Sequence, residues 1–297
     1  MNQLFKKVKI VEVGPRDGLQ NIKDSISTEN KVRFVEMLAD AGCTNIEITA
    51  FVHPKLIPQL ADSGEVCAKL AVRPGVQYSV LVPNAKGMER AIEFGIKEIA
   101  VFTAASETFN MKNTNTTIDG SIERFREVVD MARKNNIAVR GYVSTVFGCP
   151  FEKQIAPEKV LEVTGKLFDL GIYEVSLGDT IGVAVPTDVE RVLEKVLAKF
   201  DMAKIALHMH DTRGTALANV VKGREMGITV FDASAGGLGG CPFAPGAAGN
   251  LATEDIVYTF EKMGVSTGID IEKLTQASRF MEGVLGRKLP SRYLSTK

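Results

Sequence analysis

The chain has 297 residues, of which 45% are hydrophobic and 24% are charged, as in an ordinary globular protein. Its 36 basic and 36 acidic residues balance, which excludes the charge signature of nucleic-acid or membrane-surface binding, and no apolar run is long enough to span a bilayer. The first ten residues resemble neither a signal peptide nor a transit peptide, and the four cysteines form no C-x-x-C motif, so we expect a cytoplasmic protein with free thiols.

Short β-rich runs recur along the chain, each followed by a stretch with helical features. Their starts are about thirty residues apart, which is the size of one strand–helix unit. There are eight such runs, and each is short enough to be a buried strand. They are Val8–Val13, Asn45–Ala50, Gln77–Val82, Glu98–Thr103, Ala138–Thr145, Tyr173–Leu177, Lys204–Met209 and Val230–Ala235.

The stretches between these runs carry helix start and stop signals. We expect a helix that opens at Ser27 and closes at Gly42, and another that begins at Ile122 and ends near Asn135. Pro157 is expected in the first turn of a further helix, where its missing N–H costs nothing. One more helix is expected from Thr187 to about Phe200.

Eight strand–helix alternations predict a parallel sheet that closes into a (β/α)8 TIM barrel. The alternative is an open doubly wound sheet, which is less favoured because no G-x-G-x-x-G follows the first run. No linker interrupts the chain, so residues 1–297 are expected to form a single catalytic domain. The barrel would take about residues 6–265, followed by a helical tail of about 266–297 that could cap a barrel end or contact a partner subunit.

Two of the three histidines stand at the end of the seventh run. Side chains two residues apart on a strand point to the same face, so His208 and His210 aim at one point. Two converging imidazoles form half of a metal site. The alternative is a pair of hydrogen-bonded core histidines.

Other chemically capable residues follow the same ends of the expected strands, where the active site of a (β/α)8 barrel lies. Each also has a structural interpretation. Asp17 could stabilise its own turn, Glu47 could be an ion-pair partner of Arg16, and Asp179 could be a turn or cap residue. Asn250, which we expect at the start of the last barrel helix, could be only its N-cap, and Cys241 could be an inert residue of a glycine-rich loop.

Five segments carry a family resemblance that extends over roughly residues 6–290. The chain resembles the hydroxymethylglutaryl-CoA lyase family of metal-dependent (β/α)8-barrel lyases. The loop around Cys241 looks like the signature loop of these lyases, with their catalytic cysteine. The segments are VGPRDGLQN (13–21), EITAFV (47–52), GDTIG (178–182), HMHDTRG (208–214) and GLGGCPFAPG (237–246).

The resemblance implies a metal site and a reaction. Asp17, His208, His210 and Asn250 would bind a divalent cation, with Mg2+ or Mn2+ favoured and Zn2+ or Co2+ also compatible. Four protein ligands leave two octahedral positions, which a substrate carboxylate and tertiary hydroxyl could occupy together. The implied reaction is the retro-Claisen cleavage of hydroxymethylglutaryl-CoA, an acyl-CoA, to acetoacetate and acetyl-CoA in leucine breakdown.

The resemblance also implies roles for individual side chains and an assembly. Arg16 would bind the substrate and stabilise the charge of the thioester enolate, and Cys241 would protonate the departing acetyl carbanion. Glu47 and Asp179 would orient Arg16 or relay the hydroxyl proton. The family suggests a homodimer.

The nearest alternative is a Claisen-condensing acyltransferase of the isopropylmalate, citramalate or homocitrate synthase type, which would use the same metal site. Three features favour the lyase: Leu19, where those synthases generally carry glutamate, the Cys241 loop, and the lack of a C-terminal regulatory domain. An aldolase that acts on a free hydroxy acid and a non-catalytic barrel are more distant alternatives.

Overall fold

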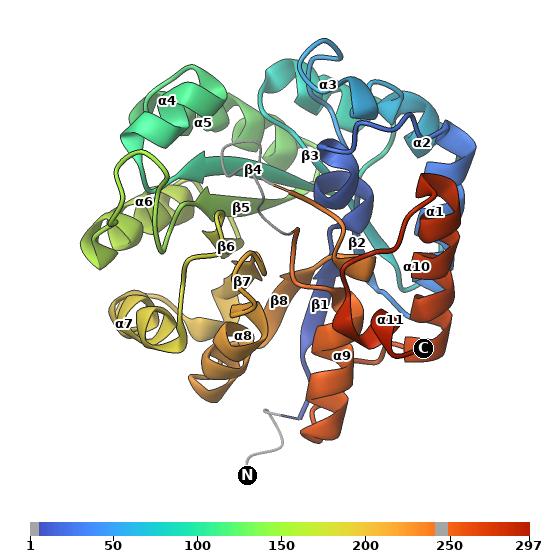
Figure 1. The fold of residues 1–297 in the computed structure, drawn as a ribbon. Coiled ribbons are helices and arrows are strands. Elements are labelled where there is room, and N and C mark those ends of the chain that lie inside the picture. The colour runs from blue at the N-terminus through green and yellow to red at the C-terminus, as the bar shows by residue number, and fades with distance from the viewer. Residues whose placement is uncertain (1–5, 241–248) are drawn as a thin grey trace.

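The computed structural model describes residues 6–240 and 249–297. In these residues eight parallel strands close into a barrel in the order β1 to β8, and helices surround it (Figure 1). The barrel closes where β1 pairs with β8 from Lys9↔Val230 to Glu12↔Ala233. This architecture confirms the predicted (β/α)8 TIM barrel.

The strands match the eight predicted runs to within one or two residues at their ends. The largest differences are in β6, which extends to Asp179, and in β8, which stops two residues early because the chain turns at Ala235–Gly237 with Gly236 and Gly237 at positive φ. The strands are β1 Lys9–Glu12, β2 Asn45–Ala50, β3 Gln77–Leu81, β4 Glu98–Ala104, β5 Ala138–Ser144, β6 Glu174–Asp179, β7 Ile205–Met209 and β8 Val230–Ala233.

The helices begin at the capping signals in the sequence. Ser27 accepts a hydrogen bond from the Asn30 amide at the start of α1, as predicted. The helix expected from Ile122 begins four residues earlier, at Ile118, because Thr117 caps it by accepting from the Gly120 amide. The helices are α1 Thr28–Asp40, α2 Ser63–Lys69, α3 Ala85–Glu93, α4 Glu107–Thr114, α5 Ile118–Lys134, α6 Pro157–Asp169, α7 Pro186–Leu197, α8 Ala216–Glu225, α9 Thr253–Lys262, α10 Ile271–Leu285 and α11 Arg292–Ser295.

The C-terminal tail is helical, as predicted, and it lies on the outside of the barrel. Helix α10 packs against α1 and α9, and α11 packs against α9 (Figure 1). The helices of the tail therefore extend the outer helical layer, and the segment between α10 and α11 contacts the turn after β8, where the Ser291 amide donates to the Gly236 carbonyl at 3.1 Å. None of the described helices combines the length and the apolarity that crossing a bilayer requires.

The main apolar core lies between the strands and the outer helices. Leu207 of β7 and Phe231 of β8 are fully buried there, facing α8. Because side chains alternate along a strand, their neighbours His208 and Asp232 face the inside of the barrel. The register pairs His208 with Asp232 directly, so the interior of the barrel receives polar groups from both strands.

Candidate metal centre and active site

The loop after β1 places Arg16 and Asp17 at the mouth of the barrel. Residues Gly14–Gly18 form one π-helical turn in which the amides of Arg16, Asp17 and Gly18 all donate to the carbonyl of Val13, at 3.2, 2.8 and 3.1 Å. Such a turn is rare and frequently occurs at functional sites. It holds two adjacent charged side chains at one fixed point above the strands.

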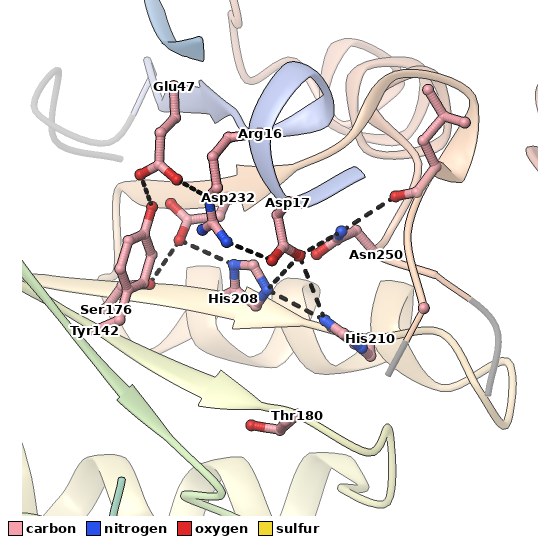
Figure 2. Close-up of polar contacts among 12 residues, drawn as sticks. Arg16, Asp17, Glu47, Tyr142, Ser176, Thr180, His208, His210, Asp232 and Asn250 are labelled. Atoms are coloured by element: carbon pink, nitrogen blue, oxygen red, sulfur yellow. Dashed lines mark hydrogen bonds and ion pairs between the residues drawn. The ribbon is translucent and has the colours of Figure 1, made fainter. Parts of the chain in front are cut away.

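The structure brings together Asp17 and the two histidines (Figure 2). Nε2 of His208 lies 3.3 Å from Nε2 of His210. Oδ2 of Asp17 lies 3.9 Å from the first nitrogen and 4.0 Å from the second. Both histidines are buried, and the cluster offers two nitrogens and one oxygen that lie within 4.8 Å of one another.

This donor set fits a divalent cation. Metal–ligand bonds of about 2.1 Å allow two ligand atoms to be at most about 4.2 Å apart, and the three distances satisfy this limit. Burial, followed by the neighbouring His208, lowers the pKa of His210 to about 4, so the imidazole is neutral at pH 7, as a metal ligand must be. Burial would raise the pKa of Asp17, but Arg16 and then the histidines lower it to about 2, which keeps the carboxylate charged.

Asn250 lies beside this cluster. It forms an isolated β-bridge with His210, and its Nδ2 donates to Oδ2 of Asp17 at 2.9 Å and to the carbonyl of Leu238 at 3.1 Å. Its other amide atom, Oδ1, is buried without a hydrogen-bond partner among the described residues. An unpartnered oxygen of this kind is the atom through which an asparagine binds a hard cation.

The expectation that Asn250 starts the last barrel helix is wrong. Helix α9 begins at Thr253, and its N-cap position is Ala252. Asn250 stands two residues before that cap because residues 250 and 252 pair with the ends of β7 and β8 through bridges to His210 and Ser234. The purely structural interpretation of Asn250 as a helix cap is thereby excluded.

Arg16 is fixed by a ring of contacts (Figure 2). Its Nε donates to Oε1 of Glu47, its Nη1 donates to Oδ1 of Asp17 at 2.6 Å, and its guanidinium lies 5.6 Å from the centre of the Tyr142 ring. The Tyr142 hydroxyl donates to the other Glu47 oxygen at 2.8 Å. Burial would lower the pKa of Arg16, but Glu47 and Asp17 outweigh it and raise the pKa further, so the charge is permanent.

Glu47 is therefore the ion-pair partner of Arg16, one of the two interpretations that the sequence left open. Both of its carboxylate oxygens are engaged, by Arg16 and by Tyr142. Nη2 of Arg16 makes no hydrogen bond to any described residue. The guanidinium is thus held from two sides, and its side chain is buried.

Below the metal cluster, Asp232 supports His208. Its Oδ2 lies 3.2 Å from Nδ1 of His208 and accepts from the Ser176 hydroxyl at 2.8 Å. Because a carboxylate only accepts, Nδ1 must carry the imidazole proton, which leaves the lone pair of Nε2 facing the cluster. Arg140, itself buried, donates to both Asp232 oxygens at 2.7 and 3.2 Å and to Glu174 at 2.6 Å.

Asp232, Arg140 and Tyr142 were not among the site residues predicted from the sequence. One signal was present for the first two: a charged residue inside a predicted buried strand is expensive unless it is paired. Strand alternation would also have placed Arg140 and Tyr142 on one face of β5. What the sequence lacked was the identity of their partners, which come from other strands.

Asp179 does not join this group. It is buried at the end of β6, and its carboxylate accepts from the amides of Val183 and Ala184 at 3.0 and 2.9 Å. Burial raises its pKa, and the charges that act on it come from Arg213 and Asp188. Among the described residues, no contact links it to Arg16 or to the histidines, so its catalytic role stays a prediction.

Cys241 lies outside the described residues. The chain that leads to it does reach the site: the Leu238 carbonyl accepts from Asn250, and the Gly240 carbonyl accepts from Nδ2 of Asn21 at 2.8 Å. The predicted role of the cysteine therefore stays a prediction. The other three cysteines, Cys43, Cys67 and Cys149, are free thiols.

Comparison with known proteins identifies relatives over nearly the whole chain. Residues 7–281 match the HMGL-like family. The chain is 54% identical to the hydroxymethylglutaryl-CoA lyase YngG of Bacillus subtilis over 97% of both chains.

Solved structures give the same result. The crystal structure of the Bacillus subtilis HMG-CoA lyase superposes with a TM-score of 0.96 at 53% identity and covers 98% of both chains. That of an Acinetobacter baumannii HMG-CoA lyase in complex with coenzyme A and 3-methylmalate superposes with a TM-score of 0.95 at 39% identity, over 99% of this chain and 96% of that one.

Proposed function

The chain belongs to the HMGL-like family, and we propose that it is a divalent-metal-dependent lyase that cleaves hydroxymethylglutaryl-CoA to acetoacetate and acetyl-CoA. One observation carries the proposal beyond family membership. Asp17, His208 and His210 converge at the mouth of the barrel, and the fixed cation Arg16 bonds directly to one of these prospective ligands. A metal site next to a permanent positive charge suits a reaction in which negative charge develops on carbon and oxygen.

Asp17, His208, His210 and Asn250 would hold the cation, for which we propose Mg2+ or Mn2+. The tertiary hydroxyl and a carboxylate of the substrate would chelate the cation, and the cation would acidify that hydroxyl. Asp232 keeps His208 in the tautomer that presents Nε2, and Asn250 keeps Asp17 in place through its Nδ2. The ligand set is thus pre-organised by hydrogen bonds within the protein.

Arg16 is proposed to stabilise the charge that cleavage creates. As the hydroxyl proton is lost, its oxygen becomes the ketone of acetoacetate. The bond between the hydroxyl-bearing carbon and the α-carbon breaks, and the electron pair moves onto the thioester enolate. Glu47 and Tyr142 hold Arg16 on one side, so its free Nη2 can donate to the developing oxyanion without reorganisation.

Cys241 is proposed to complete the reaction by giving its thiol proton to the enolate carbon, which yields acetyl-CoA. The hydroxyl proton would pass to a solvent base at the barrel mouth, and the Cys241 thiolate would later regain a proton from solvent, so the protons balance and no water is consumed. For Asp179 we propose a different role from the relay first considered: its two bonds to the Val183 and Ala184 amides fix the loop after β6.

Several finer statements are also proposals. The named coenzyme A complex of the Acinetobacter baumannii relative supports an acyl-CoA substrate. The bacterial source of YngG supports a cytoplasmic enzyme, for which we propose a place in leucine degradation. The family resemblance supports a homodimer in which residues 1–297 of each subunit form one catalytic domain.

The test is a coupled assay on purified protein that has been stripped of metal and then supplied with Mg2+ or Mn2+. We expect hydroxymethylglutaryl-CoA to yield equal amounts of acetyl-CoA and acetoacetate, and a chelator to abolish the reaction. If a metal-saturated protein released no acetyl-CoA but condensed acetyl-CoA with a 2-oxo acid, the proposal would be wrong.

A further inference from the structure

A buried carboxylate beneath the active-site turn has no part in the chemistry described so far. Glu12 is the last residue of β1, and its exposed fraction is 0%. Among the described residues no lysine, arginine or histidine pairs with it; its three hydrogen-bond donors are neutral. Burial raises its pKa to about 7, although the hydrogen bonds from Thr253, Ala235 and Gly14 oppose the shift. Such a group costs stability, so its contacts need an explanation.

The three donors come from three segments that are far apart in the sequence. Oε1 of Glu12 accepts from the Gly14 amide at 2.7 Å and from the Ala235 amide at 2.9 Å, and Oε2 accepts from the Thr253 hydroxyl at 2.6 Å. Gly14 begins the π-helical turn, Ala235 begins the turn after β8, and Thr253 is the first residue of α9. One carboxylate therefore joins the ends of β1 and β8 to the start of α9.

Each of these segments leads to a residue of the proposed site. Asp17 stands three residues after Gly14, and Asn250 stands three residues before Thr253. The turn at Ala235–Gly237 leads to Leu238, whose carbonyl accepts from Asn250. Asp17 and Asn250 are in turn bonded to each other at 2.9 Å, so a shift in any one segment would reach both residues.

The chain around Glu12 is shaped to allow these contacts. A Cβ atom added to Gly14 would lie 2.6 Å from Oε1 of Glu12, closer than real Cβ contacts come. Only glycine lets the amide of residue 14 approach the carboxylate at this distance without displacing it. The contact between the Gly14 amide and Glu12 therefore depends on the absence of a side chain at residue 14.

We propose that Glu12 is a positioning residue that sets Asp17 and Asn250 at metal-binding distance from the histidine pair by joining the π-helical turn, the turn after β8 and the start of α9. The inference rests on the proposed function, because it assumes that these residues hold a cation. Glu12 itself touches neither metal nor substrate. Its effect on the site passes through the backbone of Gly14 and Ala235 and through Thr253.

Glu12→Met tests this proposal with little change in side-chain length. Methionine offers no acceptor oxygen, so it leaves both backbone amides and the Thr253 hydroxyl without their partner. Thr253→Val removes the hydroxyl from the other side of the same contact, whereas Thr253→Ser retains it. The readout is the Mn2+ dissociation constant of the substrate-free protein, measured by titration calorimetry, with circular dichroism to verify folding.

We expect Glu12→Met and Thr253→Val each to weaken Mn2+ binding by about tenfold, as changes to groups that support metal ligands do. Thr253→Ser should keep the wild-type constant. The Glu12→Met/Thr253→Val double variant should bind no more weakly than Glu12→Met alone, because that change already removes the partner of the Thr253 hydroxyl. Folded single variants with wild-type affinity, or fully additive losses, would overturn the proposal.

Glu261→Ala is the matched control. Glu261 lies at the other end of α9 and accepts the same kinds of donors, the amide and hydroxyl of Thr267, both at 2.7 Å. This variant should keep the Mn2+ constant within about twofold; an equal loss would show that general loosening, and not Glu12, explains the effect. Failure of the wild-type protein to cleave hydroxymethylglutaryl-CoA would refute the proposed function, whereas the ratio of Mn2+ constants tests Glu12 alone.

Discussion

Replacing Asp232 with alanine separates its support of the metal ligand from its support of the fold. The change removes two hydrogen bonds from Arg140, one from Ser176 and the contact with Nδ1 of His208. Removing one partner of a buried ion pair costs about 3–5 kcal/mol, because the remaining charge stays buried. Arg140 keeps Glu174 at 2.6 Å, so we expect the lower end, a loss of about 3 kcal/mol in the free energy of unfolding.

The same variant should bind Mn2+ about 10- to 100-fold more weakly, because His208 loses the group that fixes its tautomer and orientation. Urea unfolding of the metal-free protein measures the first quantity, and titration calorimetry measures the second. Ser176→Ala is the control: it removes one bond to Asp232 and should cost about 1–2 kcal/mol while leaving Mn2+ affinity within about twofold. A folded Asp232→Ala protein with wild-type Mn2+ affinity would refute the reasoning.

Further predictions concern the site itself. Glu47→Gln should lower kcat about 10- to 100-fold, because Arg16 loses its charged partner, while Mn2+ affinity stays unchanged; steady-state kinetics would contradict this if only KM moved. Cys241→Ser should reduce turnover at least 100-fold with Mn2+ binding intact, and a comparable loss of metal would exclude the proposed proton-donor role. Asp17→Ala should weaken Mn2+ binding at least tenfold, and unchanged metal content would remove Asp17 from the ligand set. In the metal-free protein, the folded pKa of His210 is about 4 and its ordinary value is 6.5, so the unfolded state binds the extra proton first. Neutral His210 should therefore contribute about 3 kcal/mol to the free energy of unfolding above pH 6.5, and this contribution should be lost as the pH falls to 4. If urea unfolding gave the same pH slope for His210→Asn as for the wild type, the prediction would be contradicted.

The fold could be predicted because its signals are local. Each of the eight runs is short and rich in apolar or β-branched residues, and capping residues such as Ser27 and Pro157 mark the helices between them. The end points that the prediction missed also have local causes that were misjudged: Thr117 caps α5 one turn before Ile122, and the glycines at 236 and 237 end β8 early.

The site could be predicted only in part, because half of it depends on contacts between strands. His208 and His210 are two residues apart on one strand, so their convergence follows from alternation alone. The pairing of His208 with Asp232 depends instead on the register of β7 against β8, which the sequence does not state. The same holds for Arg140, which bonds across the barrel interior to Asp232.

Asn250 lies beside Asp17, as the family resemblance implied, although the local secondary structure expected for it was wrong. Its proximity to Asp17 was inferred from the family resemblance, whereas its own sequence context suggested a helix cap. The backbone bridge to His210 carries it into the site, and that bridge pairs segments about forty residues apart.

The central claim is that Asp17, His208, His210 and Asn250 surround one cation at the barrel mouth. Anomalous diffraction from a crystal soaked in Mn2+ tests it most directly. We predict a single strong peak about 2.0–2.3 Å from a carboxylate oxygen of Asp17, Nε2 of both histidines and Oδ1 of Asn250. A peak elsewhere, or no peak at this point in protein that binds Mn2+ in solution, would contradict the account.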